Sequence, residues 1–345
     1  MDGEAGLVAG MARLAARLPS TGRVAGTGEP PSILSRRADR LVVRRGDVVL
    51  KAHPDGTDPR HLAARLGIAA RSDLAGVLLP PLTSTPMRVG ARLVSAWPAG
   101  RALGPRDADA APWERAGALL ARLHRAPVGL GDLAALPPAT VLRRLADRVA
   151  RLRPHAGHPL VDPILAATAT LGDPSAAAGP GRPTSLVHGD FHFGQLVHLG
   201  QPPAPPAEHW RIIDVDDLGL GDPAWDLARP AAWFAAGLLP VDRWARFLDA
   251  YTAHGGPALP GGDPWRALDL PARALTVEYA ATAVAAHLDP ADLDPAHLEP
   301  ARLEAARLEA DSPGGLDQAS AALVEACGRI VATAGPASSS RRVGH

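Results

Sequence analysis

Side chains that could do chemistry are concentrated in two short segments of the sequence. Residues 187–195 read VHGDFHFGQ, and residues 212–217 read IIDVDD. Each segment opens with apolar residues that would form a buried strand and continues into a carboxylate, Asp190 in the first and Asp214 in the second. Two neighbouring strand ends would therefore present both carboxylates to one cleft. Such oxygens suit Mg²⁺, which binds one or two protein carboxylates together with substrate phosphates.

The lysine content of the chain is unusual. Lys51 is the only lysine beside 35 arginines, and the sequence contains no asparagine. Lysine is normally among the commonest residues, so this composition indicates a codon bias that replaced lysine by arginine wherever either would serve. The remaining lysine would then lie at a position whose role a guanidinium cannot fill. The alternative interpretation is an ordinary solvated lysine at the edge of a strand. We therefore treat Lys51 as a candidate functional residue.

The first third of the chain is predicted to form a small sheet with one helix. Residues 41–44 and 48–53 are rich in β-branched side chains and flank a short turn that contains glycine, which predicts a hairpin. Further strands are expected over residues 77–79 and 92–97. Asp58 precedes a proline and predicts the N-cap of a helix that ends near residue 70.

The rest of the chain is predicted to be mainly helical around the two carboxylate segments. Apolar residues at helical spacing predict helices over residues 113–123, 141–152, 226–239, 243–251, 271–287 and 316–334. A leucine at every fifth position from residue 288 to residue 308 does not stay on one face of a helix. We therefore interpret residues 288–312 as a low-complexity insertion.

Composition divides the chain into four parts. An amphipathic stretch and a linker rich in Pro, Gly, Ser and Thr predict a flexible N-terminal arm over residues 1–30. Residues 31–97 form the predicted N-terminal lobe. Residues 98–335, which begin with the sequence PAG, form the predicted C-terminal lobe. The last residues, 336–345, are expected to be a disordered tail.

Three motifs taken together resemble the aminoglycoside phosphotransferase family. They are HGD-x-H-x-G-Q, I-I-D-x-D-D and, from Gly221, G-D-P-A-x-D-L-A. The hairpin with the lysine, SAWP at 95–98 and LARLH at 120–124 precede them in the family's order, and the resemblance covers about residues 33–285. It implies an α+β, two-lobed protein-kinase-like fold, with a small β-rich N-terminal lobe and a larger, mainly helical C-terminal lobe. The nucleotide would bind between the lobes.

The resemblance implies roles in phosphoryl transfer for four residues. Asp190 would be the catalytic base that orients the acceptor hydroxyl and takes its proton. Asp214 would bind the Mg²⁺ that bridges the nucleotide phosphates, and Lys51 would bind the α- and β-phosphates. Gln195 stands where the family usually places an asparagine as the second magnesium ligand. Its carbonyl is the same group on a longer stem, which leaves metal contact open.

Five further residues receive binding or supporting roles. Val49 lies two residues before Lys51 on the same strand face and could cover the base, to which Ala96 and Trp97 would offer backbone groups. His188 is expected to brace the catalytic loop through a hydrogen bond. Asp226 is expected to cap its own helix or to brace that loop.

Three residues keep two interpretations each. His192 could contact phosphate or substrate, or it could pack under the loop. Asp216 and Asp217 could shape the acceptor pocket, or they could face water. Nothing in their spacing separates these roles.

The resemblance implies a small-molecule kinase that transfers the γ-phosphoryl group of ATP or GTP to a hydroxyl group. The acceptor would be an aminoglycoside, a sugar or a choline-like alcohol, and Gln195 favours a sugar or another neutral polyol. The alternative is a catalytically weak or inactive kinase-like protein that binds a nucleotide or another ligand. It is favoured because residues 58–70 contain no glutamate to pair with Lys51, and because Gln195 replaces the asparagine of the family. Asp190, Asp214 and Lys51 are present and oppose it.

The sequence argues against several other classes of protein. A metal-dependent phosphoesterase with the G-D-x-H motif also needs G-N-H, which a chain without asparagine cannot supply, and no P-loop is present. Equal numbers of acidic and basic residues argue against a nucleic-acid module, and Cys327 alone can form no internal disulfide. We expect no membrane segment. Because the acidic start is unlike a secretory signal, we expect a cytoplasmic protein.

Overall fold

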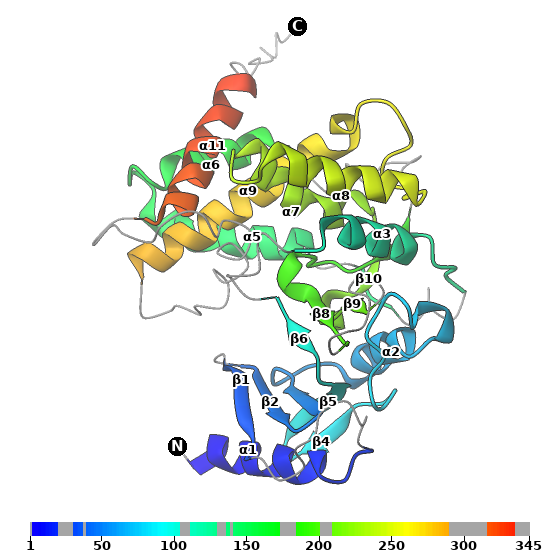
Figure 1. Ribbon diagram of the computed structural model, residues 1–345. Coiled ribbons are helices and arrows are strands. Elements are labelled where there is room, and N and C mark those ends of the chain that lie inside the picture. Colours follow the sequence, from blue (N-terminus) through cyan, green and yellow to red (C-terminus); the bar gives the residue numbers. More distant parts are fainter. Residues whose placement is uncertain are drawn as a thin grey trace, which may run out of the picture.

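The computed structural model has a sheet-rich N-terminal lobe and a larger, helical C-terminal lobe, which lie one above the other in Figure 1. This division confirms the predicted α+β class. The structure describes residues 2–19, 30–36, 39–103, 111–129, 136–138, 141–172, 184–200, 209–289 and 316–334. The insertion expected at 288–312, apart from its first two residues, and the tail expected at 336–345 lie outside these ranges.

Five antiparallel strands form the sheet of the N-terminal lobe in the order β1-β2-β3-β5-β4. Their bounds are β1 Ser32–Arg36, β2 Leu41–Arg45, β3 Val48–Ala52, β4 Met87–Val89 and β5 Arg92–Pro98. The predicted hairpin is β2 and β3. Since β3 lies between β2 and β5, with Lys51 opposite Val42 and Ser95, strands on both sides fix the backbone of the lysine.

Alternation along β2 and β3 gives the sheet two different faces. Val43, Val48 and Leu50 are buried on one face and belong to a hydrophobic cluster of the N-terminal lobe alone. Val49 lies on the opposite face and packs against the core of the C-terminal lobe. Because side chains two residues apart share a face, Lys51 also points toward the C-terminal lobe.

The N-terminal residues differ from the flexible arm expected over residues 1–30. Asp2–Ala15 form helix α1, which lies along the sheet at the bottom of Figure 1. Met11 is completely buried against β2 and β3, and Arg45 Nη1 donates a hydrogen bond to the Ala12 carbonyl at 2.6 Å. The apolar outer face of the sheet has to be covered, and the amphipathic start of the chain covers it.

Helix α2 (Pro59–Ala69) begins at the predicted cap. Asp58 Oδ1 accepts hydrogen bonds from the backbone N–H groups of Arg60 at 2.7 Å and His61 at 3.4 Å. These two donors would otherwise have no partner at the start of the helix. Leu62 of α2 is buried in the core shared with the C-terminal lobe, so the helix belongs to the junction between the lobes.

The segment after α2 pairs with the C-terminal lobe instead of the N-terminal sheet. We predicted a strand over residues 77–79, but this segment forms a single isolated parallel bridge with Ile212. The Leu79 N–H donates to the Ile212 carbonyl, and the Ile212 N–H donates to the Val77 carbonyl, both at 2.9 Å. The segment therefore ties α2 to the strand that precedes Asp214.

Helices form most of the C-terminal lobe in the described residues. They are α3 Trp113–His124, α5 Val141–Leu152, α6 Asp162–Thr170, α7 Ala224–Ala235, α8 Val241–Ala253, α9 Trp265–Leu288 and α11 Gln318–Ala334. Helix α6 has no counterpart among the predicted helices, and α9 starts before the predicted residue 271. No helix in the described part of the chain has the length and apolar character that crossing a membrane requires.

Two small antiparallel sheets lie where the helices meet the N-terminal lobe (Figure 1). One contains β6, β8 and β9, and the other contains β7 and β10. Their bounds are β6 Arg101–Ala102, β7 Ser185–Val187, β8 Leu196–His198, β9 Trp210–Ile212 and β10 Gly219–Gly221. Both predicted carboxylate segments leave strands of these sheets.

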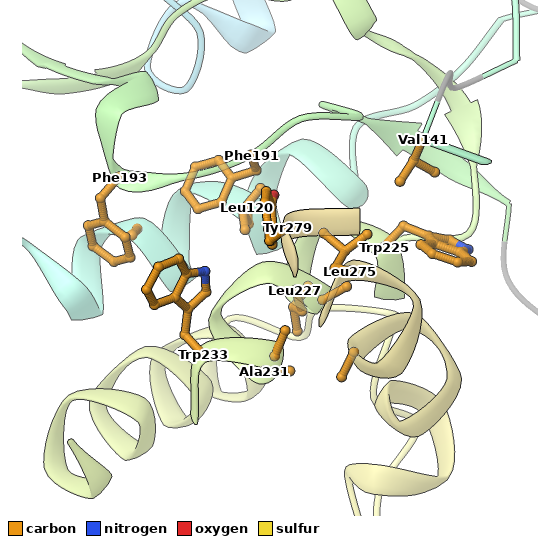
Figure 2. Packing of buried hydrophobic residues seen from close by; sticks show 14 of the residues in the cluster. Leu120, Val141, Phe191, Phe193, Trp225, Leu227, Ala231, Trp233, Leu275 and Tyr279 are labelled. Atoms are coloured by element: carbon orange, nitrogen blue, oxygen red, sulfur yellow. The ribbon is translucent and has the colours of Figure 1, made fainter. Parts of the chain in front are cut away.

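Aromatic side chains anchor the loop of residues 190–195 in the core (Figure 2). Phe191 and Phe193 are buried in one cluster with Leu120 of α3 and Trp233 of α7. Burial of each phenylalanine contributes roughly 1.5–3 kcal/mol. The position of this loop is therefore a consequence of helix packing.

Truncation of Met11 tests whether α1 is part of the folded lobe. We expect Met11→Ala to lower the free energy of unfolding by about 2–5 kcal/mol, because a completely buried methionine leaves a cavity against the sheet. Urea titration measures this difference. Arg13→Ala, at an exposed position of the same helix, should change the free energy by less than about 0.5 kcal/mol. Equal effects of the two substitutions would contradict the packing of α1.

Candidate active site

Two strand pairs bring the carboxylate segments together. Asp190 follows β7, which pairs with β10, and Asp214 follows β9, which pairs with β8. The Ile213 N–H donates to the Gln195 carbonyl at 2.8 Å and extends the β8–β9 pairing to the residue before Asp214. The two segments are therefore held together by backbone hydrogen bonds before any side chain takes part.

The backbones of the two segments also approach each other closely at Gly189. This residue has φ of 82°, and a Cβ atom there would collide with the carbonyl of Asp217. Only glycine permits both the conformation and the approach. Asp214 has φ of 62° and is the one non-glycine residue with positive φ in the described ranges. Such backbone strain costs about 1–3 kcal/mol and is typical of functional sites.

Asp226, in the first turn of α7, fixes the loop that carries Asp190. Its carboxylate is 1 % exposed and accepts the backbone N–H groups of His188 at 2.6 Å and Gly189 at 2.8 Å. Burial alone would raise the pKa of Asp226, but the hydrogen bonds that it accepts from His124 and from the His188 N–H lower it. A charged carboxylate thus braces the loop, which is one of the two roles considered for this residue.

The His124 ring is fixed from both sides. Its Nε2 lies 2.9 Å from Asp226 Oδ2, and its Nδ1 lies 2.8 Å from the Tyr251 hydroxyl. That hydroxyl also accepts the N–H of Ala258 at 3.1 Å. We assign the ring proton to Nε2 and the hydroxyl proton to the bond with Nδ1, because an ionised carboxylate can only accept. This chain of bonds connects α3 and α8 to the brace.

His188 and His192 are both buried next to Asp190. The His188 ring bridges the two segments: Nε2 lies 2.8 Å from the Ile213 carbonyl, and Nδ1 lies 3.4 Å from the Asp190 N–H. Since the Asp190 N–H donates, Nδ1 accepts and Nε2 carries the proton. His192 lies close enough to Asp190 for its charge to lower the pKa of that carboxyl.

Lys51 reaches from the N-terminal sheet to the second carboxylate segment. Its Nζ lies 2.6 Å from Asp214 Oδ1 and 2.8 Å from Asp216 Oδ2, and 11 % of the side chain is exposed. Burial alone would lower the pKa of Lys51, but the two carboxylates raise it. Lys51 is therefore a charged residue of the junction and not a solvated strand-edge lysine.

Asp216 lies on the lysine's side of the site. Its Oδ1 lies 3.5 Å from His53 Nδ1, and its Oδ2 lies 3.9 Å from Arg40 Nη1. His53 is fixed in turn by Ser95 Oγ, 2.8 Å from Nε2. Burial would raise the pKa of Asp216, but Lys51 and His53 hold it well below its ordinary value. With 14 % of its side chain exposed, Asp216 does not face water, which was one of the two roles considered for it.

Arg144 of α5 forms ion pairs with three carboxylates on the side of the site opposite Lys51. Its Nη2 lies 3.3 Å from Asp190 Oδ1, its Nη1 lies 3.3 Å from Asp217 Oδ2, and its Nε lies 3.3 Å from Glu278 Oε1. Nη1 also donates to the Gly189 carbonyl at 3.1 Å. Burial would lower the pKa of Arg144, but the carboxylates raise it. One arginine thus fixes three acids and the loop backbone.

Two of the three carboxyls that meet at Arg144, Asp190 and Glu278, have opposite pKa shifts. Burial would raise the pKa of Asp190, but Arg144 and Arg229 hold it well below its usual range. Burial raises the pKa of Glu278, and the charge of Asp190 adds to this effect despite Arg144. Asp190, whose side chain is 34 % exposed, is therefore the carboxylate that is ionised and open to an incoming group.

Ala96 and Trp97 lie in β5, where the resemblance places the nucleotide base. The Ala96 carbonyl already accepts the Leu82 N–H at 2.8 Å. Leu82 thus occupies one of the two acceptor positions of that carbonyl. Trp97 lies opposite Val49 in the sheet, and its indole N–H donates to Ser95 Oγ at 2.9 Å.

The donors around Asp214 fit Mg²⁺. Asp214 and the buried Gln195 carry hard oxygens and lie on adjacent backbone segments, and Mg²⁺ needs only one or two protein ligands besides phosphates and water. Lys51 Nζ and the Asp216 N–H both contact the same oxygen of Asp214, Oδ1. Within the described ranges, no group of three or more His, Cys, Asp or Glu side chains is placed to hold a metal. The donor set thus suits an ion whose coordination a nucleotide completes.

Several residues of the site were not singled out from the sequence, among them Arg144, Arg65 and His53. Arg144 and Arg65 are two of 35 arginines, so their residue type does not distinguish them from arginines without a role in the site. Arg65 of α2 donates from Nε to the Leu218 carbonyl at 2.9 Å. His53 lies two residues after Lys51 on the same face, and the strand period of two could have identified it.

Comparison with known proteins gives relatives at the level of family and fold. The model of the phosphotransferase enzyme family matches residues 34–268. No curated protein matches the sequence. The family match includes the lysine, both carboxylate segments and the brace.

Solved structures share the fold at low sequence identity. A choline/ethanolamine kinase family protein from Mesorhizobium loti is 18 % identical, with 93 % of this chain and 99 % of that chain covered and a TM-score of 0.55. Spectinomycin phosphotransferase in complex with ADP and spectinomycin is 14 % identical, with coverages of 88 % and 93 % and a TM-score of 0.53. The GDP complex of aminoglycoside 2′-phosphotransferase-IIIa is 16 % identical, with coverages of 81 % and 92 % and a TM-score of 0.53. These likenesses confirm the two-lobed protein-kinase-like fold.

The buried brace implies a pH-dependent contribution to stability. At about pH 7 we expect Asp226→Asn to lower the free energy of unfolding by about 2–3 kcal/mol, because the two buried N–H groups then face an amide with a single acceptor oxygen. The pKa of Asp226 in the folded protein lies below the ordinary value of 3.8. Its contribution is therefore present above 3.8 and is lost as the pH falls through the folded-state pKa.

Urea titrations of both proteins at several pH values measure this effect. The difference between wild type and Asp226→Asn should begin to shrink below about pH 4, where the unfolded chain takes up a proton at Asp226. It should be smallest below the folded-state pKa, where the folded wild type is protonated as well. Asp249→Asn, at an exposed position on α8, is the matched control and should follow the wild type. A difference that stays constant at low pH would contradict a charged brace.

Proposed function

We propose that this chain, which belongs to the phosphotransferase enzyme family, transfers the γ-phosphoryl group of ATP or GTP to a hydroxyl group of a small molecule. One observation carries the proposal: Lys51 Nζ lies 2.6 Å from Asp214 Oδ1, on the segment that packs against the Asp190 loop. A base for the hydroxyl, a cation for the phosphates and a carboxylate for Mg²⁺ are the parts that phosphoryl transfer needs.

Asp190 would orient the acceptor hydroxyl and take its proton. As the acceptor oxygen bonds to the γ-phosphorus, the bond from that phosphorus to the bridging oxygen breaks and the nucleoside diphosphate leaves. The hydroxyl proton passes to the Asp190 carboxylate. The low pKa of Asp190 makes it a weak base, which suffices because the hydroxyl loses its proton late in a loose transition state.

The nucleotide would bind along β3 and β5. Lys51 would bind the α- and β-phosphates, Val49 would cover the base, and the Trp97 region would border it. Asp214 with Gln195 would hold Mg²⁺, which when bound neutralises phosphate charge in the transition state. The contact between Lys51 and Asp214 already orders both side chains in the folded protein, so nucleotide binding needs less ordering.

The acceptor would bind on the Arg144 side of Asp190. Asp217 and Glu278 meet there and could accept hydrogen bonds from hydroxyl or amine groups of the acceptor. Relatives of similar fold are named for spectinomycin, for aminoglycosides and for choline or ethanolamine. We infer a small polar molecule with a free hydroxyl group for this chain.

A contact in the structure favours activity over the alternative of a catalytically weak binding protein. That alternative relied on the absence of a glutamate in residues 58–70 to pair with Lys51. Asp216 supplies a carboxylate at 2.8 Å from Nζ, although it comes from a different part of the chain. The pairing of Lys51 with Asp216 thus supports the proposal of an active enzyme.

Substitution of Asp190 should separate chemistry from nucleotide binding. We expect Asp190→Asn to lower kcat by about 10²–10⁴-fold, because the amide cannot take the proton. Release of ADP or GDP measures kcat, with an acceptor found by screening aminoglycosides, sugars, choline and hydroxy amino acids. Nucleotide with Mg²⁺ should still raise the Tm of the variant as it raises that of the wild type.

Two further variants complete this test. Asp214→Ala should lose the Mg²⁺-dependent stabilisation by nucleotide, which is about 2.7 kcal/mol at a hundredfold excess over the Kd. Asp249→Asn, exposed on α8, should keep both turnover and stabilisation. Full turnover of Asp190→Asn, or no stabilisation of the wild type by millimolar ATP or GTP, would refute the proposal.

Arg144 should set the low-pH limit of activity. We expect Arg144→Met to move the acidic limb of the kcat profile to higher pH by about 1–3 units, because loss of the guanidinium raises the pKa of Asp190. A series of kcat measurements from acidic to neutral pH checks the shift. Arg143→Met removes the same charge from an exposed position of α5 and should leave the limb in place. Identical profiles for the two variants would exclude this role of Arg144.

A further inference from the structure

We propose that Asp216 is the positioning residue of Lys51: its carboxylate, on the loop after β9, holds the lysine for the nucleotide phosphates in place of an acid on α2. This inference rests on the proposed function, because it concerns how the phosphate-binding lysine is held. The contacts of Lys51, Asp216 and Arg65 carry it.

Lys51 contacts two carboxylates that have different tasks. Its Nζ lies 2.6 Å from Asp214 Oδ1 and 2.8 Å from Asp216 Oδ2. Asp214 is the proposed magnesium ligand, and a carboxylate bound to a metal offers an ammonium group less negative charge. Asp216 can therefore hold Nζ both before and after nucleotide binds.

Asp216 is tied to the same sheet that carries the lysine. His53 Nδ1 lies 3.5 Å from its Oδ1, and Arg40 Nη1 lies 3.9 Å from its Oδ2. Both groups come from the N-terminal lobe, from just after β3 and just before β2. Only 14 % of the Asp216 side chain is exposed. These contacts therefore fix its carboxylate relative to β3 as well as relative to its own loop.

Helix α2 presents the wrong charge to serve as the lysine's partner. Its sequence, PRHLAARLGIA, contains no acid. The side chain that it sends to the loop after β9 is Arg65, whose Nε donates to the Leu218 carbonyl at 2.9 Å. The helix therefore fixes the loop, and the loop supplies the acid that fixes Lys51.

The test is a double-mutant cycle between Lys51 and Asp216, measured as the affinity for ADP in EDTA. Without metal, this affinity reports the contact between lysine and phosphate. We expect Lys51→Met and Asp216→Asn each to weaken ADP binding about tenfold. The double variant should bind ADP no more weakly than Lys51→Met, because Asp216 acts only through the lysine. Additive losses, or wild-type affinity of Asp216→Asn, would overturn the inference.

Steady-state kinetics with Mg²⁺ separate positioning from a general structural effect. Asp216→Asn should raise the KM for nucleotide about tenfold while the KM for the acceptor stays within about twofold. Asp216→Glu keeps the carboxylate and should restore most of the loss. Asp55→Asn, whose side chain is 83 % exposed in the same lobe, is the matched control and should behave as wild type.

Each other outcome has a defined meaning. If the wild type binds no ADP, the proposed function fails; if it binds ADP and Asp216→Asn binds equally well, only this inference fails. A variant that needs more Mg²⁺ but keeps its affinity in EDTA would make Asp216 a metal ligand and overturn the inference. Asp216→Ala is the second variant if Asp216→Asn does not fold, and misfolding of both would make the role structural and overturn it as well.

Discussion

Carboxylates crowded into a small volume repel one another, and the whole site is organised around this repulsion. The segments 187–195 and 212–217 bring their aspartates together where Gly189 lets the backbones approach. Two cations offset the repulsion, Lys51 from the sheet and Arg144 from the helices. At a separation of 4 Å and an effective dielectric constant near 20, a pair of like charges costs about 4 kcal/mol. The approach of the two segments therefore depends on both cations, and hence on both lobes.

The site combines interactions that can change partner with interactions that cannot. Lys51 and Arg144 hold carboxylates through ion pairs, and phosphate or acceptor groups can compete for these charges. Asp226 instead binds two backbone N–H groups, and buried His124 completes its hydrogen bonds. These N–H groups are buried, so a ligand that enters the site cannot reach them and take the place of Asp226. The loop under Asp190 therefore stays fixed, while the charged side chains around it are free to respond to ligands.

Local sequence patterns predicted the features that depend on neighbouring residues. The strand period placed Val49 and Lys51 on one face, and the two motifs located both carboxylate segments. Features that depend on distant contacts were missed, among them the packing of α1 and the role of Arg144. Asp216 and Asp217 show the limit most clearly, because they are adjacent and chemically identical. Only the turn after Asp214 sends one to the lysine and the other to the arginine.

The two cations also differ in kind, and the difference follows from what each one contacts. Arg144 uses three nitrogens to contact three carboxylates and a carbonyl, which suits a flat guanidinium. Lys51 concentrates its charge on one atom that lies within 2.8 Å of two carboxylates. A single ammonium can exchange one of these oxygens for a phosphate by rotation, whereas a guanidinium would have to move as a plane. The proposed contact of Lys51 with phosphate would therefore account for one lysine among 35 arginines, because a bias toward arginine would be opposed where a point charge has to exchange partners.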